Sequence, residues 1–178
     1  MKATITLISL SAFLLGCGSI NPVTLAKVAR LSPLDADPAV MGVEIELPPG
    51  IGVREGEARI TFFSTRTDTN QSISETFVLE DMNNSQFQIA RDDLDRLRET
   101  QTTVRNWETE APRANSGGIN VTVGPCIYGN GPDPDARASL SVRIDESGTF
   151  YPLVTNGPLS EVVGDEDLSA FPTCAGPT

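Results

Sequence analysis

The feature that most constrains this chain is a set of short segments in which apolar and polar residues alternate. In the first of them Val43, Ile45 and Leu47 are separated by Glu44 and Glu46. Successive side chains of an extended strand point to opposite faces, so this alternation predicts a half-buried β-strand. Six more segments rich in β-forming residues follow, at 58–63, 73–79, 87–90, 119–123, 138–144 and 149–155. The chain is therefore expected to be mainly β.

Between the fourth and fifth of these segments the spacing changes to that of a helix. Apolar or core-compatible residues recur every three or four positions: Leu94, Leu97, Gln101, Val104 and Trp107. This spacing places them on one face of an amphipathic helix. We expect Asp92 or Asp93 to cap the start of the helix and Pro112 to end it.

Seven short strands and one mid-chain helix predict a two-layer β-sandwich with a helical crossover. The alternative is an α+β fold with a single antiparallel sheet and the helix on one face. Turn-forming residues predict a loop at 115–118 and a bulge or strand end at Gly124-Pro125. Residues 157–178 are acidic and rich in Pro and Gly, and we expect them to wrap the surface as far as Cys174.

The N-terminal residues follow the plan of a secretory signal, with Lys2 before an apolar run from Ala3 to Leu15. The run is shorter than the roughly 20 residues that a membrane-spanning helix needs. It closes on Leu14-Leu15-Gly16-Cys17, which resembles the lipobox of bacterial lipoproteins. The resemblance implies that the thiol of Cys17 is diacylglycerylated, residues 1–16 are cleaved, and the new amine is acylated, with palmitate for example. An ordinary secretory signal is the alternative.

The same resemblance predicts location and domain organisation. Gly18 follows the cysteine where inner-membrane lipoproteins often carry Asp, which implies the periplasmic face of the outer membrane. We divide the chain into a signal peptide (1–16), a lipidated cysteine with a tether (17–41) and a periplasmic β-rich domain (42–178). Within the tether, residues 24–31 have a spacing that fits either a short docked helix or a loose spacer.

Charge and cysteine content fit this location. Removing residues 1–16 of the 178 leaves 162 residues and, with Lys2 gone, changes the net charge from −11 to −12. An acidic surface disfavours nucleic acid and anionic lipid head groups, so attachment to the membrane must come from the lipid. With Cys17 assigned to lipid, Cys126 and Cys174 remain as an even pair in an oxidising compartment, and they predict a disulfide. Two free thiols are the alternative.

The sequence excludes several kinds of catalytic and metal site. The chain contains no His, which excludes Ser-His-Asp catalysis and His-containing zinc sites, and we expect no cofactor and no metal. Asn130, Asp133 and Asp135 gather oxygen atoms in one loop, but their spacing departs from a calcium loop, so a solvated turn is expected. The acidic run at 165–167 is expected to be an exposed tail. Glu44 and Glu46 are a carboxylate pair that a glycoside hydrolase could use, and the wet face of a strand is the expected alternative.

A partner surface is the remaining candidate site. Arg98, Arg105 and Arg113 flank Trp107, the only Trp, and both residue types are enriched at interface hot spots. Packing of Trp107 in the core is the competing expectation.

Most of the mature chain resembles uncharacterised lipoproteins of marine alphaproteobacteria. The resemblance is carried by these residues: Ser32-Pro33-Leu34, Asp37-Pro38, Leu47-Pro48-Pro49-Gly50, Leu94, Leu97, Gln101, Arg105-Asn106-Trp107 and Pro125-Cys126. The first strand with Leu47-Pro48-Pro49 is also similar to the small β-sandwich lipoproteins that act as pilotins for secretion channels. We therefore expect a non-enzymatic, lipid-anchored protein whose periplasmic domain binds a protein or envelope component and supports envelope or secretion assembly. A carboxylate-dependent envelope hydrolase is the alternative.

Overall fold

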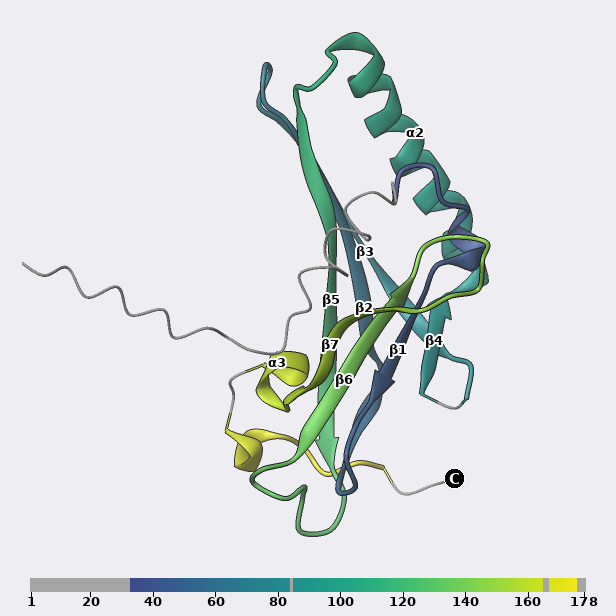
Figure 1. Cartoon of the computed structure of the whole chain (residues 1–178). Helices are drawn as coiled ribbons and strands as arrows, with labels where there is room; N and C mark the ends of the chain where they lie inside the picture. Colours follow the sequence, from purple (N-terminus) through teal and green to yellow (C-terminus); the bar gives the residue numbers. More distant parts are fainter. Residues whose placement is uncertain (1–32, 84, 165–166, 176–178) are drawn as a thin grey trace, which may run out of the picture.

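Seven β-strands are joined edge to edge in the computed structural model, which describes residues 33–83, 85–164 and 167–175 (Figure 1). The strands pair antiparallel in the order β5-β2-β3-β4-β1-β6-β7. Their bounds are β1 (Gly42–Glu46), β2 (Ile51–Arg66), β3 (Gln71–Asp81), β4 (Gln86–Ile89), β5 (Asn115–Ile127), β6 (Arg137–Arg143) and β7 (Tyr151–Pro158). The helical elements are η1 (Pro38–Val40), η2 (Arg91–Asp93), α2 (Leu94–Glu110), α3 (Ser160–Val163) and η3 (Leu168–Ala170).

The sheet curls into a half-barrel. Strand β3 pairs with β2 over residues 71–78 and with β4 over residues 79–81, so it continues from one half of the sheet into the other. The long strands β2, β3 and β5 form an arm with α2 beside it, and α3 packs against both edge strands, β5 and β7 (Figure 1). The mainly β prediction is confirmed. The two-layer sandwich is not confirmed, because all seven strands belong to one hydrogen-bonded sheet, as in the alternative of a single antiparallel sheet.

The core follows the alternation of the strands. Phe77, Val43 and Val142 are fully buried, and Leu97 of α2 joins them from the helix. On β6 and just beyond it, the predicted inward residues Leu140, Val142 and Ile144 are all buried, which confirms that part of the pattern.

One predicted break in the strands was wrong. Residues 115–118 are the first part of β5 and not a loop, because they pair with β2 up to Arg66↔Asn115. The predicted bulge at Gly124-Pro125 is present as a register shift, since Pro125 pairs with Val53 and Val123 pairs with Ala58. Strand β5 does not end there, and the extra residues of the bulge belong to β2.

The helix α2 lies where the spacing predicts it, but its start is different. The side chain of Asp93 does not cap the helix, and its carboxylate instead accepts hydrogen bonds from Arg96. Arg96 also pairs with Glu75 of β3 and lies over the ring of Phe77, 4.2 Å from its centroid. Asp93 therefore helps to attach the helix to the sheet and does not satisfy its first N–H groups.

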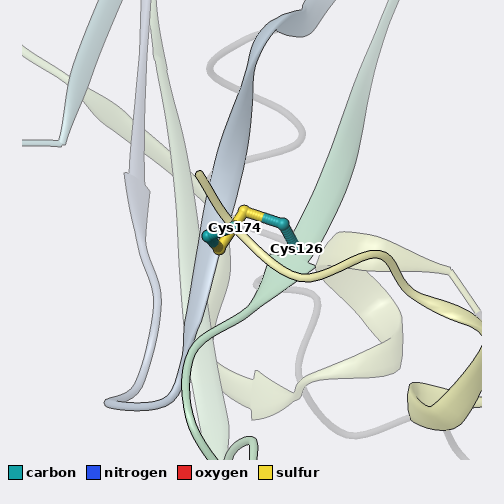
Figure 2. The surroundings of a disulfide bond; sticks show 2 residues. All are labelled: Cys126 and Cys174. Carbon is teal, nitrogen blue, oxygen red and sulfur yellow. A yellow bond between two sulfur atoms is a disulfide. The ribbon is translucent and has the colours of Figure 1, made fainter. Parts of the chain in front are cut away.

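The tail after β7 is more ordered than its composition predicts. It forms α3, where Leu159, Val162 and Val163 are buried against the sheet. The disulfide between Cys126 and Cys174 is present and joins the end of β5 to this tail (Figure 2). Backbone hydrogen bonds from Ile127 to Pro172 and from Cys174 to Ile127 place the tail beside β5.

Candidate functional site

The later part of the predicted tether, just before η1 and β1, is fastened to α2. We call residues 33–37 the strap. The side-chain amide of Gln101, a residue only 2% exposed, donates to the carbonyl oxygens of Pro33 and Ala36, at 2.8 Å each. Arg105 donates to the carbonyl oxygen of Leu34 at 2.6 Å, and Arg98 donates to Asp37 at 3.0 Å. One face of α2 therefore holds the chain at the point where it enters the domain.

Two of these contacts are made by residues that the sequence predicts as a partner surface. Arg98 and Arg105 bind the strap, so both guanidinium groups have partners within the chain. Trp107 is half-buried, and Arg113 is exposed in the turn between α2 and β5, with a positive φ of 68°. The predicted residues therefore do not form one partner surface: Arg98 and Arg105 contact the strap, and Arg113 lies in the turn. The strap itself was not predicted as a binding partner of these arginines, since nothing in the spacing of α2 indicates contacts more than 60 residues away.

The ion pair at the end of the strap gives a prediction about pH. The backbone N–H of Ala39 and the guanidinium of Arg98 lower the pKa of Asp37 from its ordinary value of 3.8. A carboxylate with a lowered folded-state pKa contributes stability above its ordinary pKa and loses it as the pH falls through the lowered value. We expect Asp37→Asn, which keeps a capping oxygen, to be less stable than the parent at pH 7 and equally stable at low pH. Because Asp37 is exposed, the effect at pH 7 should be small.

Urea unfolding midpoints of the two proteins, measured from pH 7 down to about pH 3, test this expectation. Arg98→Gln is the matched control, because it removes the other member of the ion pair. It should reduce the stability difference between the parent and Asp37→Asn. A stability difference that stays constant across the pH range would contradict the assignment.

The other predicted sites do not converge. Asp133 accepts a hydrogen bond from the backbone N–H of Asp135 in an exposed turn, and Asn130 is exposed in the same loop. The described residues contain no group of three or more His, Cys, Asp or Glu side chains placed to hold a metal. Glu44 accepts a hydrogen bond from Gln86 on the neighbouring strand, and Glu46 is exposed. Cys17 and the pair Asp165-Glu166 lie outside the described residues.

The outer side of the arm is a feature that the sequence analysis missed. The register of β2 with β3 and β5 sets cross-strand rows on this side, and three neighbouring rows of nine residues are considered together; the next row contains Arg59. None of the nine is charged, and six carry a hydroxyl group. The rows are Thr65, Ser72 and Ser116; Phe63, Ser74 and Gly118; and Thr61, Thr76 and Asn120. We call this surface the hydroxyl face; by strand geometry it measures about 13 Å by 10 Å.

Phe63 is the one aromatic residue of the hydroxyl face. It is 42% exposed, and its ring leans over Gly118, 3.4 Å from where a Cβ would lie. Hydroxyl pairs flank it on both sides along the strands, Thr61 with Thr76 at 3.0 Å and Thr65 with Ser72 at 3.1 Å. The result is an exposed aromatic ring bordered by polar, uncharged groups.

A hollow of about 200 Å³ lies on the opposite, inner side of the arm, between α2, the strap and strands β2 and β5. Its apolar walls include Leu34 of the strap, Phe62 and Val104, and its polar residues are Ser64, Asn115 and the acidic Glu108 of α2. In the described part of the chain, the buried Oδ1 atom of Asn115 has no hydrogen-bond partner. An unpaired buried acceptor of this kind costs about 1–3 kcal/mol.

Two adjacent glycines of β5 allow its close approach to β2 and leave room for the ring of Phe63. A Cβ on Gly117 would lie 2.3 Å from the carbonyl oxygen of Phe63, so only Gly allows β5 to approach β2 here. Gly118, on the other face, leaves room for the ring of Phe63. Glycines inside a strand indicate close backbone approach, but residues 115–118 were predicted as a loop, so this signal was not used.

Within the described residues, no helix is long and apolar enough to cross a membrane. No protein-family model, curated protein or solved structure matches this chain.

Proposed function

We propose that this chain is a bacterial lipoprotein. It is held by lipid on Cys17 at the periplasmic face of the outer membrane, and its β-rich domain is a non-enzymatic binding module. The lipobox-like Leu14-Leu15-Gly16-Cys17 and the pairing of Cys126 with Cys174 support a location outside the cytosol. The supporting role in envelope or secretion assembly belongs to the same proposal.

The observation that carries the proposal is the attachment of the strap to α2. The strap begins 16 residues after Cys17, so it lies between the proposed lipid site and the β-rich domain. The buried amide of Gln101 and the guanidinium of Arg105 together bind three backbone carbonyl groups of the strap. Fastening the strap on α2 fixes the point at which the chain coming from Cys17 enters the domain.

The change that tests the anchor is Cys17→Ser. Acylation by more than one chain gives stable anchoring, and a protein without acyl chains has no such hold. We expect the parent protein to sediment with membranes and to carry a mass increase on Cys17, and the variant to lose both. Fractionation of a bacterial expression host, with mass spectrometry of the N-terminal peptide, measures the two outcomes.

Gly18→Asp is the matched control, because it leaves the lipidated thiol intact and alters only the residue linked to sorting. It should remain in the membrane fraction and shift toward the inner membrane. A parent protein with an unmodified Cys17 would contradict the anchor.

A further inference from the structure

We propose that residues 24–31, the segment just before the strap, dock as a short helix in the hollow between α2, the strap and strands β2 and β5. The segment lies outside the described residues, whereas the hollow belongs to the described part of the domain. The inference rests on the proposed function, because it says how the tether from a lipidated Cys17 is attached and how far it reaches.

The first argument is position. Pro33 and Leu34, the first two described residues, are themselves walls of the hollow. Their carbonyl oxygens accept hydrogen bonds from side chains of α2, so the chain that precedes Pro33 starts at this wall. Each residue adds at most about 3.6 Å, so Leu31 lies within about 7 Å of Pro33 in any conformation. The hollow is therefore beside the point at which residues 24–31 join the domain.

The second argument is the size and lining of the hollow. Its volume of about 200 Å³ is below the roughly 300–1,000 Å³ of small-molecule sites, so it suits aliphatic side chains better than a free ligand. Phe62 and Val104 are buried apolar walls, and Glu108 is exposed beside them on α2. Glu108 forms no ion pair with another described residue. An occupant with aliphatic side chains and a neighbouring positive charge matches both features.

The third argument is the chemistry of residues 24–31. In a helix they present one apolar stripe, because aliphatic residues recur at every third position: Leu25, Val28 and Leu31. Lys27 lies at the edge of this stripe and Arg30 lies behind it, and residues 17–34 contain no acidic residue. A basic segment thus precedes a strongly acidic domain, and attraction between the two favours docking. Lys27 is the expected partner of Glu108.

The fourth argument concerns the alternatives for the apolar stripe. A segment of eight residues is too short to be stable as an isolated helix, so it needs a surface on which to bury this stripe. The bilayer beside the lipid is the other apolar surface that a basic amphipathic segment could use. The hollow is favoured, because the strap already holds one end of the segment beside it and so raises the local concentration of the segment there.

Docking sets the reach of the tether. With residues 24–31 in the hollow, the free tether consists of residues 18–23 and spans at most about 20 Å. With the segment released, the free tether consists of residues 18–32 and spans at most about 50 Å. The docked segment therefore keeps the β-rich domain close to the bilayer, and its release lets the domain extend toward partners deeper in the periplasm.

The test is chemical cross-linking of the full-length, lipidated protein, in detergent and in lipid vesicles. Lys27→Cys/Glu108→Cys places one thiol on the segment and one beside the hollow, and a short bis-maleimide joins them when they are neighbours. Lys27→Cys/Glu99→Cys is the matched control, because Glu99 is exposed on the opposite side of α2, nine residues before Glu108. We expect the first pair to cross-link about ten-fold faster than the control, since docking concentrates one thiol beside the other.

Further substitutions in the same cross-linking pair test the apolar stripe. Leu25→Ser/Val28→Ser should slow the cross-linking about ten-fold, to the rate of the control, because the segment loses the side chains that fill the hollow. Ala26→Ser/Ala29→Ser, two changes to the same residue type outside the stripe, should leave the rate well above that of the control.

Three results would overturn the proposal. The first is equal cross-linking to positions 108 and 99, and the second is cross-linking that Leu25→Ser/Val28→Ser does not slow. The third is cross-linking in detergent that is lost in vesicles, because the segment then lies on the bilayer. The mass of the N-terminal peptide, measured on the same samples, reports acylation of Cys17 by itself. Failure of docking in an acylated protein leaves the anchor intact, and an unmodified Cys17 contradicts the anchor whatever the cross-linking shows.

Discussion

Removal of the Cys126–Cys174 disulfide is expected to lower the free energy of unfolding by about 4 kcal/mol, from the loop-closure entropy of the unfolded chain. The two cysteines are 48 positions apart, and the segment between them holds β6, β7 and α3. Without the bond, a short parallel bridge at Ile127↔Thr173 with its two backbone hydrogen bonds and the packing of α3 keep the tail on β5. The half of the sheet that closes against α3 should therefore open more readily.

Urea unfolding of a Cys126→Ser/Cys174→Ser double variant measures this effect, with Trp107 as the fluorescent probe. Both proteins should carry Cys17→Ser, so that no third thiol exchanges with the bond. The parent in reducing agent should approach the double variant, and the double variant itself should not respond to reductant. A loss of less than about 1 kcal/mol would mean that the tail is held mainly by its other contacts.

Phe77→Ala is expected to destabilise the protein by about 3–5 kcal/mol, the usual cost of deleting a large buried aromatic side chain. Phe77 has no exposed surface, and it lies in β3 where the sheet meets α2. The substitution leaves a cavity and also removes the ring beneath the guanidinium of Arg96. Since Arg96 pairs with Glu75 and Asp93 at the start of α2, we expect the helix to loosen from the sheet as well.

Val78→Ala is the matched control, because Val78 is the next residue and points to the opposite, outer side of the sheet. It is 39% exposed, and its truncation should cost less than about 1 kcal/mol. Urea midpoints of the two variants, measured under the same conditions, give the comparison. Equal losses from Phe77 and Val78 would contradict the assignment of inner and outer faces on β3.

Local patterns in the sequence determined which segments became strands and helix. Alternation placed Val142 and its neighbours on the inner face, and the three-to-four spacing placed Leu97 and Val104 on the buried side of α2. These predictions succeeded because side-chain direction in a strand or helix depends on the backbone of a few adjacent residues. The number of cysteines predicted the disulfide, since only Cys126 and Cys174 remained once Cys17 was assigned to lipid.

Long-range pairing could not be read from the sequence. The register of β5 with β2 turned a predicted loop at 115–118 into a strand and placed Phe63 beside Gly118. Pairing of β2 with β3 and β5 also gathered hydroxyl residues from three strands into one uncharged face. The local sequence of each strand does not indicate this face, because its residues come from segments far apart in the chain.

The lipobox-like motif and the period of each segment were thus available from the sequence alone. The curl of the sheet, the strap held by Gln101 and Arg105, the hydroxyl face and the hollow beside α2 were decided only by the tertiary structure. The physical reason is that periodicity says which way a side chain points from its own backbone. Which other side chains it meets depends on contacts between strands and helices far apart in the chain.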